Sequence, residues 1–202
     1  DTCAGHPESG APAYRPLFRT GPDRTAWRRL DLPPPALLEF GGRRFLEGAP
    51  ETLRAVAEAA FGDVQHLFRS THLEGLRRVV LDPDSSPADR FVSLELLKNA
   101  VIAAGRVFPS GQDPGAAIVM GKKGQAVLTQ GDDREPLSAG IRDAFARGNL
   151  RFSQLAPLTM SEEVNTGTNL PAQIEVEAVP GETFELLMIA KGGGSANKTF
   201  LF

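Results

Sequence analysis

The spacing of apolar residues changes near Val107, and this change limits the folds that the chain can adopt. Between residues 49 and 104, apolar side chains recur every three or four positions, which indicates amphipathic helices. After residue 107, short apolar runs are separated by glycine-containing turns, which is typical of strands. This order predicts an α+β fold, in which N-terminal helices are followed by antiparallel hairpins that form a small sheet packed with helices.

Capping and turn residues locate the individual elements. Pro50-Glu51 begins the first helix, and Ser85-Ser86-Pro87 begins the third. Hairpins are expected where Gly121–Gly124 and Pro180-Gly181 each separate two apolar runs. The expected elements, in chain order, are helices with apolar faces over 53–68, 73–80 and 91–102, a hairpin at 116–129, a helix at 136–149 and a hairpin at 172–190.

The first 48 residues differ in composition from the remainder of the chain. They are rich in glycine, proline and arginine, so we expect an irregular N-terminal arm over residues 1–48. This arm is expected to dock through Leu37, Leu38 and Phe40. Residues 49–202 then form the main domain. With 202 residues, 41% of them hydrophobic, the chain is long enough to bury one substantial core.

The charge and the cysteine content exclude several classes of protein. The net charge of −3 argues against binding to nucleic acid or to a membrane surface, because both need a basic patch. No apolar run approaches the length of a membrane span, and the N-terminus lacks a signal-peptide pattern. Cys3 is the single cysteine, so this chain's own cysteines form neither a disulfide nor a zinc or iron–sulfur site. We expect a cytoplasmic protein.

A glycine triplet at 192–194 is the first candidate for a binding site. It directly follows an apolar strand, and consecutive glycine N–H groups can converge on an anion. Ser195, Asn197 and Lys198 would add side-chain donors to such a loop. The alternative is a flexible connector, because glycine- and serine-rich linkers are common.

Two further segments offer polar groups. Residues 109–115 carry Gln112 and Asp113 between glycines, although the same sequence also forms a plain turn. Arg151 stands at the start of the segment 149–171, and a guanidinium can grip a carboxylate with two hydrogen bonds. Most arginines, however, are solvated surface residues. The histidines lack metal-ligand spacing, and no serine has a matching base for a hydrolytic triad.

Three stretches, read together, resemble one known family. They are "GQDPGAAIVMGKKGQ", "NLRFSQLAPLTMSEEVNTGTNLPAQIEV" and "MIAKGGGSANKTFLF". They closely resemble the N-terminal half of class I fumarate hydratases, and the tartrate dehydratase alpha subunits share parts of the pattern. The resemblance covers about residues 36–202 and is tight from residue 107 onward. It implies a hydro-lyase that adds water reversibly to fumarate to give (S)-malate with a 4Fe-4S cluster, in which an open iron acts as a Lewis acid.

The resemblance also implies roles for individual residues. Gln112 and Asp113 match the Gln and Asp of the family's Cys-Gln-Asp-Thr-Gly motif, which contact the substrate, and Asp113 is the candidate catalytic proton donor. Arg151 matches an arginine that binds a substrate carboxylate. Gly194 matches a glycine whose backbone N–H meets the substrate. The implied ligand is therefore a small dicarboxylate, fumarate or malate.

Two departures from the family pattern are important. Gly111 occupies the position of a cluster-ligand cysteine, and glycine cannot ligate iron, so no metal ligand is assigned; Pro114 replaces the following threonine. Natural drift, engineering or a sequence error would each explain the glycine. In the family, two further cluster cysteines and the remaining catalytic residues lie beyond this region, in a C-terminal domain or beta subunit, and the full-length enzyme is a homodimer. The chain is thus expected to be an inactive fragment of such an enzyme, or alternatively a cluster-free dicarboxylate-binding or partner subunit.

Overall fold

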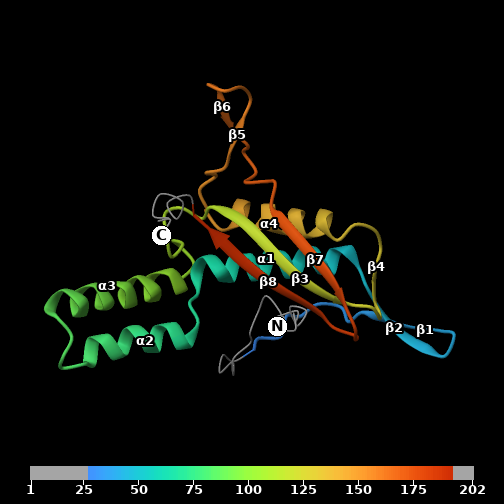
Figure 1. The fold of residues 1–202 in the computed structure, drawn as a ribbon, viewed down its shortest axis with the longest axis horizontal. Helices are drawn as coiled ribbons and strands as arrows, with labels where there is room; N and C mark the ends of the chain where they lie inside the picture. Colours follow the sequence, from blue (N-terminus) through green and yellow to red (C-terminus); the bar gives the residue numbers. More distant parts are fainter. Residues whose placement is uncertain (1–26, 193–202) are drawn as a thin grey trace, which may run out of the picture.

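The computed structural model describes residues 27–192 and confirms the α+β class (Figure 1). This part of the chain forms four helices and eight strands. In chain order they are β1 (Ala36–Phe40), β2 (Arg43–Gly48), α1 (Pro50–His66), α2 (Ser70–Leu81), α3 (Pro87–Ala104), β3 (Ala116–Gly124), β4 (Val127–Thr129), α4 (Arg134–Arg147), β5 (Leu155–Pro157), β6 (Glu163–Asn165), β7 (Gln173–Val179) and β8 (Phe184–Lys191).

All four expected helices are present, and their ends differ from the predicted bounds by only a few residues. Helix α1 has Pro50 in its first turn, and Gly148 caps the end of α4. Ser86 is the N-cap of α3, where its hydroxyl accepts a hydrogen bond of 3.1 Å from the N–H of Asp89. In return, the Ser86 hydroxyl donates to the Asp89 carboxylate at 2.7 Å. This reciprocal pair satisfies a backbone donor that the helix itself leaves without a partner.

We expect the substitution Ser86→Ala to lower the free energy of unfolding by about 1 kcal/mol, because the Asp89 N–H loses its acceptor. Urea denaturation followed by circular dichroism measures the change. Ser85→Ala is the matched control, since the Ser86 hydroxyl, and not that of Ser85, caps the helix. An equal loss of stability in both variants would contradict the assigned cap.

In the central sheet, neither of the two expected hairpins forms. Its strand order is β7-β3-β8, with β3 parallel to β7 and antiparallel to β8. Strands β7 and β8 are consecutive in the chain, but β3 lies between them and pairs with both. Strand β3 itself continues through Gly124 and does not turn at Gly121–Gly124, and β4 belongs to another sheet with β1 and β2. Close packing explains why a glycine stands at 124: a Cβ there would lie 2.4 Å from the Gly181 carbonyl oxygen in the β7–β8 turn.

The expectation of an irregular arm is also wrong for residues 36–48. Strands β1 and β2 form an antiparallel hairpin around Gly41 and Gly42. Both glycines have positive φ values, of 59° and 72°, which a two-residue hairpin turn of the primed type requires. The apolar residues that were expected to dock on the body are exposed instead: Leu37, Leu38 and Phe40. Residues 1–26 lie outside the described part of the chain.

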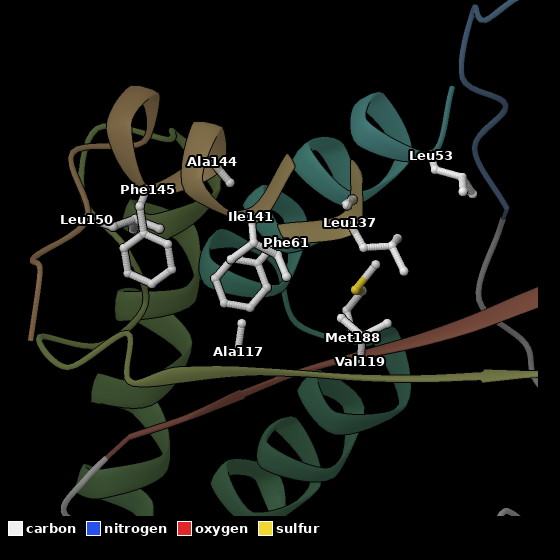
Figure 2. Close-up of a cluster of buried hydrophobic side chains, with 11 residues drawn as sticks. Leu53, Phe61, Ala117, Val119, Leu137, Ile141, Ala144, Phe145, Leu150 and Met188 are labelled. Atoms are coloured by element: carbon white, nitrogen blue, oxygen red, sulfur yellow. The ribbon is translucent and has the colours of Figure 1, made fainter. Parts of the chain in front are cut away.

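The core lies between helices α1 and α4 and the inner face of the central sheet (Figure 2). The rings of Phe61 on α1 and Phe145 on α4 stack with centroids 5.4 Å apart. Ala117 and Val119 on β3 meet the helices from the sheet and are fully buried. By contrast, the α2–α3 pair extends away from this body, and α2 has no buried residue (Figure 1). The packed body thus positions both ends of β3, and the site lies at its N-terminal end.

Candidate functional site

The loop at 109–115 leads from α3 into β3 and is held by the end of α1. The N–H of Ser110 donates to the carbonyl of Gln65 at 2.7 Å, and the Gln65 amide donates to the carbonyl of Pro114 at 3.2 Å. The amide of Asn99 also donates to the Ser110 carbonyl, at 2.7 Å. Gln65 is 4% exposed, so the bond from its side chain to Pro114 is shielded from water. The loop is irregular, as expected, but it is fixed at both ends.

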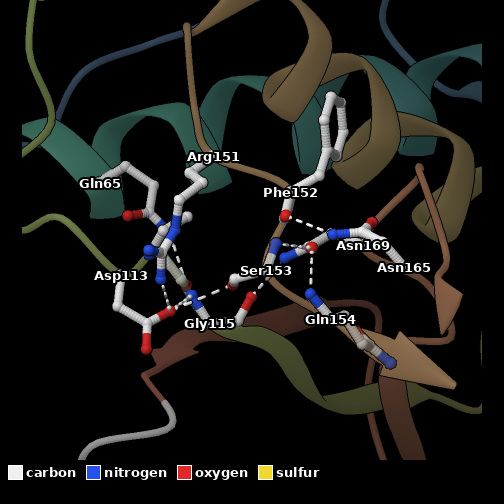
Figure 3. Close-up of polar contacts among 10 residues, drawn as sticks. Gln65, Asp113, Gly115, Arg151, Phe152, Ser153, Gln154, Asn165 and Asn169 are labelled. Atoms are coloured by element: carbon white, nitrogen blue, oxygen red, sulfur yellow. Dashed lines mark hydrogen bonds and ion pairs between the residues drawn. The ribbon is translucent and has the colours of Figure 1, made fainter. Parts of the chain in front are cut away.

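Asp113 lies near the end of this loop, and its carboxylate is oriented by several donors (Figure 3). One oxygen, Oδ1, accepts from the N–H of Gly115 at 3.0 Å and from the hydroxyl of Ser153 at 3.1 Å. The same oxygen lies 3.8 Å from Nη2 of Arg151. The expected substrate-binding residues Asp113 and Arg151 are therefore brought together. The Arg151 side chain remains 62% exposed, so its guanidinium is accessible to a ligand.

The glycine triplet begins at the same place. Gly192 follows β8, and a Cβ built on it would lie 3.2 Å from the carbonyl oxygen of Asp113 and 3.6 Å from its Oδ2. Gly115 is still closer to β8, because a Cβ there would lie 1.8 Å from the carbonyl oxygen of Lys191. Glycine at these positions lets the ends of the two strands meet, and the start of the triplet thereby borders the Asp113 carboxylate.

The other residues singled out in the sequence are distributed as follows. Gln112 is exposed next to Asp113. Gly111 is also exposed, and a Cβ built on it would meet nothing within 4 Å. Gly194 lies outside the described residues, as do the donors expected to assist it, Ser195, Asn197 and Lys198.

Asn169 is a functional candidate that the sequence did not reveal. Its side chain is fully buried, and its Oδ1 accepts from the N–H groups of Ser153 and Gln154 at 2.8 and 2.9 Å. Its Nδ2 donates to the carbonyl of Gly115 at 2.6 Å (Figure 3). The sequence does predict that "NTGTNLP" is a polar loop. The burial of Asn169, however, depends on contacts that neither the spacing of apolar residues nor the composition predicts.

The described residues do not fit an iron–sulfur cluster. Position 111 carries no side chain, and within residues 27–192 no group of three histidine, cysteine, aspartate or glutamate side chains could hold a metal ion. Within that range, too, no helix is long and apolar enough to cross a membrane. A cavity of about 630 Å³ lies elsewhere, near the start of α1, and includes Pro33, Glu47 and Gln130 in its lining.

One end of the central sheet thus carries a carboxylate, a guanidinium and the first residue of a glycine triplet. A guanidinium grips carboxylates, and glycine N–H groups permit the close approach of an anion. Fold and site together define an α+β domain with a candidate site for a small organic acid.

Comparison with known proteins identifies the family to which this domain belongs. A family model described as fumarate hydratase (Fumerase) matches residues 54–202. The chain is 55% identical to fumarate hydratase 2 of Leishmania major over 82% of its own length, and 44% identical to the anaerobic class I fumarate hydratase of Escherichia coli over 94%. The chain therefore belongs to the class I fumarate hydratase family. It spans 29% of the length of the first relative and 34% of the second.

Proposed function

We propose that this chain is the N-terminal portion of a hydro-lyase that adds water reversibly to fumarate to give (S)-malate. The observation that carries the proposal is the approach of Arg151 to Asp113, 3.8 Å apart, beside the start of the glycine triplet. These residues come from separate segments of the chain, and the fold brings them to one point. The family membership supplies the reaction class, and the partial coverage of the relatives supports the proposal that further residues lie in a C-terminal portion.

Fumarate is a rigid dianion, so its site needs fixed cationic and N–H donors for its carboxylates. In the proposed site Arg151 binds one carboxylate, while Gln112 and the N–H of Gly194 contribute further contacts. Asp113 is the proposed proton donor at the double bond. Its Oδ1 is held by Gly115 and Ser153, which fixes the plane of the carboxyl group relative to the ligand.

The proposed reaction conserves every atom of its two substrates. The oxygen of water bonds to one carbon of the double bond and releases a proton. The π electrons form a C–H bond at the other carbon with a proton from the donor. In reverse, that C–H proton is removed and water leaves. The described residues contribute to binding and to proton transfer in this scheme.

The family resemblance implies a 4Fe-4S cluster and a homodimeric assembly in the parent enzyme, and the composition favours a cytoplasmic location; we propose all three for the full-length protein. The cluster would supply a Lewis acid for the substrate. Gly111 does not fit this group, because the glycine offers no thiolate. A second candidate function follows from that misfit. A cluster-free dicarboxylate-binding or partner subunit is favoured by glycine at 111 together with the retained Gln112, Asp113 and Arg151.

A hydro-lyase portion and a dicarboxylate-binding subunit both require that a dicarboxylate binds through Arg151. We expect fumarate or (S)-malate to bind the chain at millimolar concentration, and Arg151→Ala to weaken binding about 10- to 100-fold, because one charge-assisted contact is lost. Isothermal titration calorimetry measures the change.

Arg147→Ala is the matched control for this titration. It removes the same charge from the surface of α4, where Arg147 pairs with Glu58 at 2.6 Å. Equal losses in the two variants, or no binding by the unaltered chain, would contradict the proposed site. Hydration of fumarate by this chain alone would contradict its proposed status as a portion of a larger enzyme.

A further inference from the structure

Asn169 joins the two segments that carry the proposed ligand-binding groups. Ser153, two residues after Arg151, donates its N–H to Asn169 Oδ1 at 2.8 Å. Gly115, two residues after Asp113, accepts from Asn169 Nδ2 at 2.6 Å. One fully buried amide therefore connects the backbone behind the guanidinium to the backbone behind the carboxylate.

We propose that Asn169 is a positioning residue, which sets the distance between Arg151 and Asp113 and thereby the affinity for the dicarboxylate. Ser153 is the intermediate link, because its N–H donates to Asn169 and its hydroxyl donates to Asp113 Oδ1 at 3.1 Å. The ligand in this inference rests on the proposed function, whereas the connection between the two segments does not.

The chemistry of the position favours asparagine. The side chain accepts two N–H bonds through one oxygen and donates to a carbonyl through its nitrogen, which only an amide can do. Its φ of 55° lies in the left-handed region, where asparagine is several-fold enriched among non-glycine residues. The hydroxyl of Thr166 also accepts the N–H of Asn169, at 3.1 Å. Hydrogen bonding and backbone conformation thus both favour asparagine at position 169.

The burial of Asn169 protects its hydrogen bonds from competition by water. The Asn169 side chain is 0% exposed, so water cannot replace the amide without a rearrangement of the loop. Without the amide, the N–H groups of Ser153 and Gln154 lose their acceptor. The segment that carries Arg151 then loses this buried connection to the loop that carries Asp113.

Two variants separate the roles of the amide. Asn169→Gly removes the side chain but tolerates the positive φ. Asn169→Asp keeps an acceptor for Ser153 and Gln154, but its ionised carboxylate cannot donate to the Gly115 carbonyl. Gln173→Ala is the control, because it removes an exposed amide whose partner is Glu175 on the same strand.

The first measurement is amide hydrogen exchange without ligand. Asn169→Gly is expected to speed exchange at Ser153 and Gln154 at least about tenfold while Val119 in β3 stays protected. In Asn169→Asp the same two amides stay protected. Unchanged exchange at Ser153 and Gln154 in Asn169→Gly would overturn the proposal, whatever the chain binds.

The second measurement is a double-mutant cycle on fumarate affinity. We expect Asn169→Gly and Asn169→Asp each to weaken binding about tenfold, with Gln173→Ala unchanged. In Arg151→Ala, the further change Asn169→Gly should cost less than about twofold, because Asn169 acts through Arg151. Additive losses would overturn the positioning role, since a general structural defect gives additivity.

A third variant keeps the test decisive if Asn169→Gly does not fold, which loss of protection at Val119 would reveal. Ser153→Ala removes the hydroxyl that donates to Asp113 and leaves the N–H bond to Asn169 intact. It is expected to weaken fumarate binding several-fold with exchange at Ser153 unchanged. If Ser153→Ala binds as the unaltered chain does, the proposed link is wrong. If neither the unaltered chain nor any variant binds fumarate, the proposed function is wrong. The exchange data still decide whether Asn169 connects the two segments.

Discussion

Gly115→Ala is expected to destabilise the chain by about 3–5 kcal/mol. The added Cβ would lie 1.8 Å from the carbonyl oxygen of Lys191 and 2.5 Å from the N of Gly192. Both atoms belong to the backbone, so no side chain can rotate away from the new methyl group. The φ of Gly115 is 62°, a conformation that alanine adopts only at a cost. The strands β3 and β8 must therefore separate at this end of the sheet.

The same substitution should abolish fumarate binding, because Asp113 is fixed by the N–H of Gly115 and borders Gly192. Urea denaturation gives the loss of stability, and calorimetry gives the loss of affinity. Gly111→Ala, in the same loop, is the control. A Cβ at Gly111 meets nothing within 4 Å, and its φ lies outside the left-handed region, so we expect a change within about 0.5 kcal/mol. A stable Gly115→Ala variant would show that β8 does not approach the loop this closely.

The helices could be predicted because their signals are local. Pro50 and Ser86 mark helix starts by their own backbone chemistry, and Gly148 marks an end. The sheet could not be predicted in the same way. Sequence adjacency suggested that β7 pairs with β8, whereas β3 inserts between them. Which strand lies in the centre depends on the burial of Ala117 and Val119 against α1 and α4, a contact between distant segments.

The residues of the candidate site also differ in whether the sequence could predict them. From spacing alone, Asp113 and Arg151 had only weak claims, and the family resemblance singled them out. The structure brings them together, but their roles in binding and proton transfer stay predictions. Gln65 and Asn169 were missed, because a buried amide is recognised by its partners in the fold and not by any pattern in the sequence. Gly41-Gly42 is a different case, since the hairpin signal is present in the sequence although the composition favours an irregular arm.

Gly111→Cys is the change with the largest expected effect on activity. A side chain at 111 meets nothing within 4 Å of its Cβ, so the variant should fold as the unaltered chain does. We expect a thiol there to react at once with Ellman's reagent, because position 111 is exposed. Combining Gly111→Cys with Cys3→Ser removes the other thiol of the chain. These readouts do not depend on any cluster and test the local geometry by themselves.

Activity then separates the two candidate functions. The chain should be mixed with the C-terminal portion of a class I fumarate hydratase under anaerobic iron–sulfur reconstitution. If the chain is a portion of a hydro-lyase, Gly111→Cys is expected to raise fumarate hydration from undetectable to measurable, because the position then offers a thiolate ligand. Gly111→Ser is the control, since it fills the same space without a thiol. If Gly111→Cys takes up iron and sulfide but remains inactive while the unaltered chain binds fumarate through Arg151, the cluster-free binding subunit is the better account. The distinction depends on chemistry at one exposed position, since the residues that hold Asp113 and Arg151 are the same in either case.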